Sequence, residues 1–190
     1  MIFSIKQKSS KIEQGGKAMF QKYQPDYYAE HIFALPVSFY QKRGIKTILC
    51  DLDNTLDSYR LYHPSSRVVE WKKEIDQAGI RVFIISNNHG ERVQAYASAL
   101  GVTYLANTRK PFKRNLLRFL RKNDVDLNTC ILIGDQLITD IRCAKRCKIA
   151  SVLTEPIVKE DQWTTHFNRM IDRPIRKYLK KHQRLKLWKE

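Results

Sequence analysis

From residue 44 onward, short apolar segments alternate with segments whose apolar residues recur at helical spacing. The apolar runs that predict strands cover residues 47–50, 80–85, 102–106, 131–133 and 150–153. The segments that predict helices cover residues 66–78, 91–100, 111–120 and 140–147. Gly79 and Gly101 follow two of these helices, and Pro111 lies in the first turn of another, as is usual at helix ends. This alternation predicts right-handed βαβ units and a buried parallel sheet of about five strands flanked by helices, an α/β Rossmann-like fold.

Both ends of the chain differ from this core in composition. Residues 1–18 are polar and Lys-rich and predict a flexible basic arm. Residues 19–43 are rich in aromatic residues and predict a helical layer that packs on the core at residues 44–172, with a membrane-touching surface as the alternative. Pro25 is interpreted as a helix start and Gly44 as a helix end. Residues 173–190 contain eight Lys or Arg residues and one acid, and predict a basic amphipathic tail.

Polar side chains come after four of the predicted strands, at the point where each strand ends. They are Asp51, Asp53 and Thr55, then Ser86, Asn87 and Asn88, then Lys110, and finally Asp135 and Asp140. Since ligands of parallel α/β sheets bind beyond the carboxyl ends of the strands, we expect these groups to meet at one rim. Together they supply a nucleophilic carboxylate, a second acid, oxygen ligands for Mg²⁺ and a cation for phosphoryl oxygens. This is the set that phosphoryl transfer through a phospho-aspartate requires.

Each group also has a purely structural interpretation. Asp53 and Asn54 are common turn residues, Ser86 and its neighbours resemble a helix cap, and Asp140 could stabilise a helix N-terminus. Lys110 before a proline is typical of a solvated loop. The structural interpretation needs all four coincidences in order along the chain, so the catalytic interpretation is favoured.

The four motifs resemble those of the haloacid dehalogenase (HAD) superfamily. They are Asp51-x-Asp53-x-Thr55, Ser86, Lys110 and Gly134-Asp135-(x4)-Asp140. The longer stretches Pro25-Asp26-Tyr27-Tyr28, Ser86-Asn87-Asn88 and 134–140 are similar to the bacterial YqeG group of type IIIA phosphatases, which is similar to mitochondrial phosphatidylglycerophosphate phosphatases. The resemblance covers about residues 23–172. Two departures, Arg109 and the stretch 142–148, leave the preferred substrate open.

The resemblance implies a role for each motif residue. Asp51 would be the nucleophile, Asp53 the general acid and base, and Lys110 the cation that neutralises the phosphoryl group. Ser86, Asn87 and Thr55 are assigned to the substrate phosphate site, with Thr55 fixing the loop geometry. The implied Mg²⁺ ligands are Asp51, the backbone carbonyl of Asp53, and Asp135, supported by Asp140.

The short gaps between the motifs leave no room for a cap domain, so we expect an open site that accepts a phosphate displayed on a large carrier. The net charge of +16 predicts an anionic partner. The candidates are a phosphorylated lipid such as phosphatidylglycerophosphate at an anionic membrane surface, a nucleic-acid terminus, or RNA bound by a module without catalysis. The lipid is what the family resemblance suggests. The non-catalytic module is disfavoured because the motif residues are intact and no RNA-binding motif stands out.

The location of the protein is predicted from two further features. The N-terminus has no apolar signal segment, and no run of residues is long and apolar enough to cross a bilayer. Cys50 and Cys130 are expected to pack as small apolar residues, and Cys143 and Cys147 lack the partners that a zinc site needs. These features predict the cytoplasm, including the inner face of the membrane.

Overall fold

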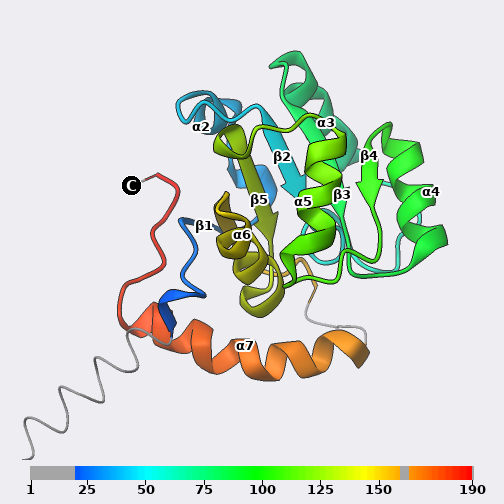
Figure 1. The fold of residues 1–190 in the computed structure, drawn as a ribbon. Helices are drawn as coiled ribbons and strands as arrows, with labels where there is room; N and C mark the ends of the chain where they lie inside the picture. The colour runs from blue at the N-terminus through cyan, green and yellow to red at the C-terminus, as the bar shows by residue number, and fades with distance from the viewer. Residues whose placement is uncertain (1–19, 159–162, 190) are drawn as a thin grey trace, which may run out of the picture.

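Six parallel strands form one sheet at the centre of the molecule. The computed structural model describes residues 20–158 and 163–189. The strands are β1 (Tyr27–Ala29), β2 (Thr47–Cys50), β3 (Arg81–Ile85), β4 (Thr103–Leu105), β5 (Cys130–Gly134) and β6 (Ala150–Thr154). Their order in the sheet is β1-β6-β5-β2-β3-β4, and every neighbouring pair is parallel (Figure 1). The α/β fold predicted from the sequence is confirmed.

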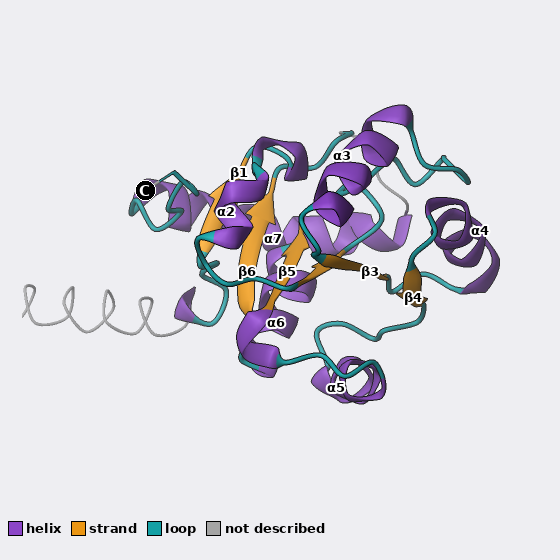
Figure 2. Ribbon diagram, turned by 90° about the horizontal axis from the view of Figure 1, so that it is seen from above, coloured by secondary structure: helices purple, strands orange, loops and turns teal. Residues whose placement is uncertain are grey.

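Helices cover both faces of the sheet because alternate strand residues point to opposite faces (Figure 2). Helices α3 (Ser66–Gln77) and α4 (Gly90–Leu100) pack on the face that receives Ile48 and Cys50 of β2. Helices α5 (Lys113–Lys122) and α6 (Arg142–Cys147) pack on the face that receives Leu49. The strands therefore read as continuous apolar runs, as expected for strands buried on both sides.

The segment predicted as a helical layer, residues 19–43, instead contributes the sixth strand. Only one turn of 3₁₀-helix (Ile32–Ala34) and the short helix α2 (Val37–Gln41) are helical between β1 and β2. The expected helix start at Pro25 is wrong: Asp26 accepts hydrogen bonds from the backbone N and Oγ of Ser151, at 2.9 and 2.7 Å. This anchor aligns Tyr27 with Val152 and lets two tyrosines, which favour strands, pair with β6.

The predicted basic tail is part of the folded domain. Helix α7 (Trp163–Lys181) passes through the expected boundary between residues 172 and 173 and crosses the carboxyl edge of the sheet (Figure 1). Its apolar residues Ile175 and Leu179 are buried against Leu137, Ile141 and Leu153. An amphipathic tail of this kind could lay Ile175 and Leu179 on a membrane, bind RNA or be solvated; the structure instead uses these two side chains to cover the core.

The chain after α7 returns to the edge strand β1. Tyr28 N donates to Lys186 O at 2.7 Å, and Trp188 N donates to Tyr28 O at 3.0 Å. The Trp188 ring meets the Phe39 ring edge to face. The predicted arm, residues 1–18, lies outside the described residues.

The connections near the site are short, as predicted. Between β2 and β3 the chain forms one loop and α3, and between β3 and β4 it forms α4 alone, so the described residues include no cap domain. Within the described ranges, no helix combines the length and apolar character needed to cross a bilayer.

Candidate active site

The predicted site residues meet between the carboxyl ends of β2 and β5. The chain leaves β2 toward β3 on one side, while β5 lies on the other, so this is the point where a parallel sheet opens a crevice. Asp51 follows β2 and Asp135 follows β5. A cavity of about 260 Å³ opens here. It is lined by Asp51, Asp53, Ser86, Asn87, Asn88, His89, Lys110, Gln136, Thr139 and Asn168.

Lys110 links the two central carboxylates of the site. Its ammonium group lies 2.5 Å from Asp51 Oδ1 and 2.7 Å from Asp140 Oδ1, and it also donates to Ile85 O at 3.1 Å. The Asn87 side chain fixes the backbone of this lysine, accepting from Lys110 N at 2.7 Å and donating to Lys110 O at 2.9 Å. Asn87 therefore positions Lys110, while its predicted contact with the substrate stays a prediction.

Asp53 lies at the mouth of the cavity and is held by two residues that the sequence did not single out as partners. Asn88 Nδ2 donates to Asp53 Oδ2 at 2.6 Å, and Arg92 of α4 forms an ion pair with the other carboxylate oxygen. Asn54 adopts a left-handed backbone conformation (φ 64°), which turns the chain directly after Asp53. Asp53 thus faces the cavity from a fixed loop, where a general acid must lie.

Asp135 and Asp140 approach each other because Gly134 has no side chain. A Cβ at Gly134 would collide with the Asp140 carboxyl group. Residues Leu137–Ile141 form one π-helical turn, which brings Asp140 back under the strand, and Asp140 Oδ2 accepts from Gln136 N at 3.1 Å. Helix α7 holds Asp135: Arg169 pairs with its carboxylate at 2.9 Å and Arg176 donates to its carbonyl at 2.7 Å.

The three carboxylates of Asp51, Asp135 and Asp140 fit a divalent cation. One oxygen of each lies within 4.8 Å of the others, and all three residues are buried. Asp135 Oδ1 is buried and has no hydrogen-bond partner among the described residues. An all-oxygen set of this kind suits Mg²⁺. The carboxylate of Asp53 is outside this cluster, and the predicted use of its backbone carbonyl stays a prediction.

The electrostatics of the site favour an added positive charge. Burial raises the pKa of Asp51 to about 7, although Lys110 opposes this rise, and Asp140 and Asp135 add to it. Burial, and then the charge of Asp140, raises the pKa of Asp135 to about 7 against the effect of Arg169. Burial would lower the pKa of Lys110, but Asp140 and Asp51 outweigh it and raise that pKa. A cation bound among the carboxylates would hold them ionised near neutral pH.

Of the two remaining predicted residues, Ser86 lines the cavity and Thr55 does not. Ser86 lines the cavity, and its Oγ accepts from Asn88 N at 3.0 Å. Thr55 is buried in the loop and is not among the lining residues, which fits a role in loop geometry more than contact with substrate. Sequence reasoning did not single out the cavity-lining residues Gln136 and Asn168. Asn168 comes from α7, the helix that the sequence did not place at the site.

Comparisons with known proteins show the relatives of this chain. A family model described as HAD-hydrolase-like matches residues 107–175. The probable phosphatase YqeG of Bacillus subtilis (strain 168) is 33% identical over 166 residues, which is 87% of this chain and 96% of that protein.

Solved structures give a weaker likeness. An uncharacterized protein from Listeria monocytogenes serotype 4b matches 62% of this chain and 85% of its own, with 16% identity and a TM-score of 0.50, which supports the fold. The 3-deoxy-D-manno-octulosonate 8-phosphate phosphatase from Moraxella catarrhalis, solved with magnesium and phosphate, is 24% identical with a TM-score of 0.44. That match covers 53% of this chain and 63% of the other.

Proposed function

This chain belongs to the family of the probable phosphatase YqeG, within the HAD-like phosphatases, and on that premise we propose that it is a magnesium-dependent phosphomonoesterase acting through a phospho-aspartate on Asp51. The observation that supports this most strongly is the contact of one buried lysine, Lys110, with both Asp51 and Asp140. Asp135 lies in the same carboxylate cluster, so the groups proposed as nucleophile, cation and metal ligands are close together beside the cavity.

In the first half-reaction, a carboxylate oxygen of Asp51 attacks the phosphorus atom of a bound monoester. The bond between phosphorus and the ester oxygen breaks, and Asp53 donates a proton to the leaving alcohol. Lys110 neutralises the charge on the phosphoryl oxygens, and Ser86 donates a hydrogen bond to one of them. The products of this step are the free alcohol and an acyl phosphate on Asp51.

In the second half-reaction, the ionised Asp53 accepts a proton from a water molecule, which attacks the same phosphorus atom. The bond between phosphorus and the Asp51 oxygen breaks, so inorganic phosphate leaves and the Asp51 carboxylate is restored. Asn88 and Arg92 hold Asp53 in the position that both proton transfers need.

Asp51, Asp135 and Asp140, with the carbonyl of Asp53, are the groups that would hold Mg²⁺. When bound, Mg²⁺ supplies positive charge that keeps the carboxylates ionised and offsets the negative charge of the phosphoryl group. The excess of buried carboxylates over Lys110 and Arg169 supports this assignment.

The proposed substrate is a phosphate displayed on a large carrier, and phosphatidylglycerophosphate is the candidate that the family resemblance suggests. Two observations support a displayed phosphate. The described residues include no cap over the cavity, and the net charge of +16 favours an anionic carrier. A phosphate that extends from a lipid headgroup satisfies both.

Replacing the nucleophile tests the mechanism. Asp51→Asn keeps the shape of the side chain but cannot form the acyl phosphate, so turnover should fall by at least about 10³. The assay compares hydrolysis of soluble phosphomonoesters, phosphorylated nucleic-acid ends and phosphatidylglycerophosphate, with Mg²⁺ and after chelation. Unchanged circular dichroism should show that the variant is folded. Near-normal turnover by a folded Asp51→Asn protein, or full activity after exhaustive chelation, would contradict the proposal.

A further inference from the structure

Several segments next to the cavity carry exposed apolar side chains. Among the described residues, eight large apolar side chains are exposed, and six of them belong to segments next to the site. These six, which we term the apolar rim, are Leu61, Tyr62, Phe112, Ile157, Met170 and Ile171. Phe112 and Met170 are the most exposed, at 66% and 64%. A group of exposed apolar side chains next to a site indicates an interaction surface there.

Contacts with site residues fix the position of two of the rim segments. Leu61 O accepts from Arg92, the partner of Asp53, at 2.7 Å. Ile157 N donates to the carbonyl of Asn54, the residue after Asp53, at 3.1 Å. These contacts place two loops, after β2 and after β6, beside the mouth of the cavity.

The other rim residues follow Lys110 and Arg169 along the chain. Phe112 follows Lys110 by two residues and begins α5. Met170 and Ile171 follow Arg169, which pairs with Asp135, on the exposed part of α7. Met170 lies on the side of α7 opposite the buried Leu179, whereas Ile171 lies one turn before the buried Ile175, at the border of the face that covers the core. Met170 is therefore fully on the solvent side of α7, and Ile171 is exposed at the edge of the buried face.

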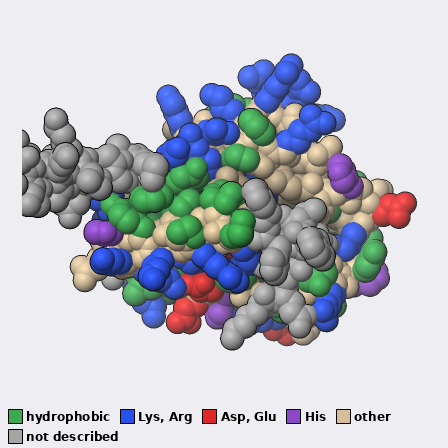
Figure 3. All heavy atoms as spheres, turned by 90° about the horizontal axis from the view of Figure 1, so that it is seen from below, with side chains coloured by type: hydrophobic (Ala, Val, Ile, Leu, Met, Phe, Trp, Pro, Cys, Tyr) green, Lys and Arg blue, Asp and Glu red, His purple; other side chains and the backbone are tan. Residues whose placement is uncertain are grey.

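Cations surround the apolar rim. Arg109, Arg114 and Arg118 line, with Phe112 and Asn115, a hollow of about 550 Å³ beside the catalytic lysine. The Arg146 guanidinium group lies 5.6 Å from the centre of the Phe112 ring. Figure 3, which shows the carboxyl edge of the sheet, has a hydrophobic band along α7 with Lys and Arg side chains on both sides. Arg109 is held in a left-handed conformation (φ 60°), which is unusual for a residue other than glycine.

We propose that the apolar rim and its surrounding cations dock the protein on a bilayer rich in anionic phospholipid, with the cavity opening at the headgroup layer. The charge complementarity and the aliphatic members of the rim favour this partner. The transfer of Leu, Ile and Met side chains from water to the acyl boundary is favourable in free energy, and the cations are attracted to lipid phosphates. A surface that binds single-stranded nucleic acid would instead be expected to carry mainly aromatic side chains, which stack on bases. The proposal deepens the proposed function, because the substrate would be a phosphate in the same headgroup layer.

Vesicle binding by the full chain carrying Asp51→Asn tests docking without turnover. The protein is sedimented with vesicles of phosphatidylcholine alone or with about one third phosphatidylglycerol. We expect at least tenfold tighter binding to the anionic vesicles at low ionic strength. That preference should weaken as NaCl rises, since exposed charges are screened within about 8 Å at physiological salt. Equal binding to both vesicles at low salt overturns the proposal.

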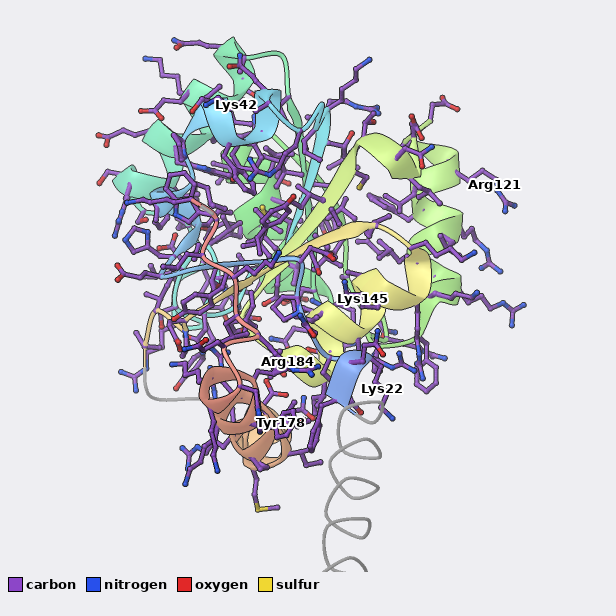
Figure 4. All side chains as sticks on the ribbon, turned by 90° about the vertical axis from the view of Figure 1, so that its left-hand side faces the viewer. Lys22, Lys42, Arg121, Lys145, Tyr178 and Arg184 are labelled. Carbon is purple, nitrogen blue, oxygen red and sulfur yellow. The ribbon has the colours of Figure 1, made fainter. Side chains whose placement is uncertain are left out.

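Two paired variants in the same Asp51→Asn chain locate the surface. Phe112→Ser with Met170→Ser, and Arg114→Gln with Arg118→Gln, should each weaken binding to anionic vesicles at least fivefold. Leu187→Ser is the apolar control, because this exposed residue lies beside β1. Lys42→Gln with Lys46→Gln is the charge control. Lys46 precedes β2, so it lies at the amino edge, and Lys42 lies far from Tyr178 of α7 in Figure 4. An equal loss in the controls overturns the placement.

Activity separates failure of docking from failure of the proposed function. With Asp51 restored, the rim variants should lower the ratio of hydrolysis of a vesicle-borne phosphate to that of a soluble phosphomonoester at least fivefold. An unchanged ratio overturns docking while the phosphatase mechanism stands. Near-normal turnover by the folded Asp51→Asn protein would contradict the phosphatase mechanism, while the result on vesicle binding would still stand. Stronger retention on single-stranded RNA than on anionic vesicles also overturns the proposal.

Discussion

Gly134 is required by the carboxyl group that approaches it from the following turn. A methyl group at this position would meet the Asp140 side chain, which in turn contacts Lys110. Gly134→Ala should therefore displace Asp140 and Lys110 and lower kcat/KM by about 10², as a displacement of about 1 Å does elsewhere. Overpacking should also cost about 1–3 kcal/mol of the free energy of unfolding. Steady-state kinetics and urea denaturation measure the two effects. If Gly134→Ala had the kinetics of the wild-type protein, the close approach of Asp140 to residue 134 would not be needed for activity.

The residues of the site were predictable to different degrees. Asp51, Lys110 and Asp135 come after strands, and the loops after parallel strands all lie at one edge of the sheet, so the meeting of these residues could be predicted. Arg92 could not, because an arginine on an amphipathic helix looks the same whether it is solvated or paired with Asp53. Arg169 was hidden for the same reason, and no spacing rule connects it with Asp135.

At the scale of the element, α7 holds the loop that carries Asp135 in place through hydrogen bonds. The Asp172 carboxylate accepts from Leu137 N at 2.7 Å and from Ile138 N at 3.0 Å. Asp172→Ala leaves one buried and one partly buried N–H donor unpaired, so the free energy of unfolding should fall by about 2–3 kcal/mol. As a positioning residue, Asp172 should also affect Mg²⁺ binding, which should weaken at least tenfold.

The Mg²⁺ affinity of Asp172→Ala is measured by titration calorimetry, and stability by urea denaturation. Lys181→Ala, an exposed change at the end of the same helix, is the matched control and should leave both unchanged. A purely structural role would lower stability while the remaining folded protein kept its Mg²⁺ affinity, and that result would contradict positioning.

The sequence identified α7 as amphipathic but not the partner of its apolar face. Ile175 and Leu179 have a spacing that suits a bilayer or a protein core equally. The core needs them because Leu137 and Ile141 would otherwise be exposed, and that need depends on the π-helical turn, which no sequence pattern showed. β1 was missed because three residues are too few for a strand pattern and its aromatic residues also suit a helix.

At the scale of the whole molecule, Glu155, which follows β6, connects the first strand β1 with the last helix α7. Tyr28 OH donates to it at 2.6 Å, and Arg176 and Lys180 of α7 pair with it at 2.9 and 3.0 Å. Burial would raise the pKa of Glu155, but Tyr28, Arg176 and Lys180 outweigh it, so the pKa lies below 4.5. The folded state therefore favours the ionised form.

Glu155→Gln should lower the free energy of unfolding by about 1 kcal/mol at pH 7, since the group is partly exposed. A depressed pKa gives stability above the unfolded value of 4.5, which is lost as pH falls through the folded value. The difference between the two proteins should therefore be constant from pH 6 to 8 and shrink below about 4.5. Thermal unfolding of both proteins at pH values above and below 4.5 measures this difference, and a difference that grew at low pH would contradict the assignment.

The return of the chain from α7 to β1 has a consequence for synthesis on the ribosome. Strand β5 can pair with β2, and β6 with β5, as soon as they emerge, but Asp135 gains Arg169 and Arg176 only after α7 has emerged as well. β1, made early, waits for Lys186 and Trp188 to pair with its outer side. The loop that carries Asp135 therefore lacks these two contacts until α7 has been translated. The proposed active site is completed only at that stage, after all six strands have been made.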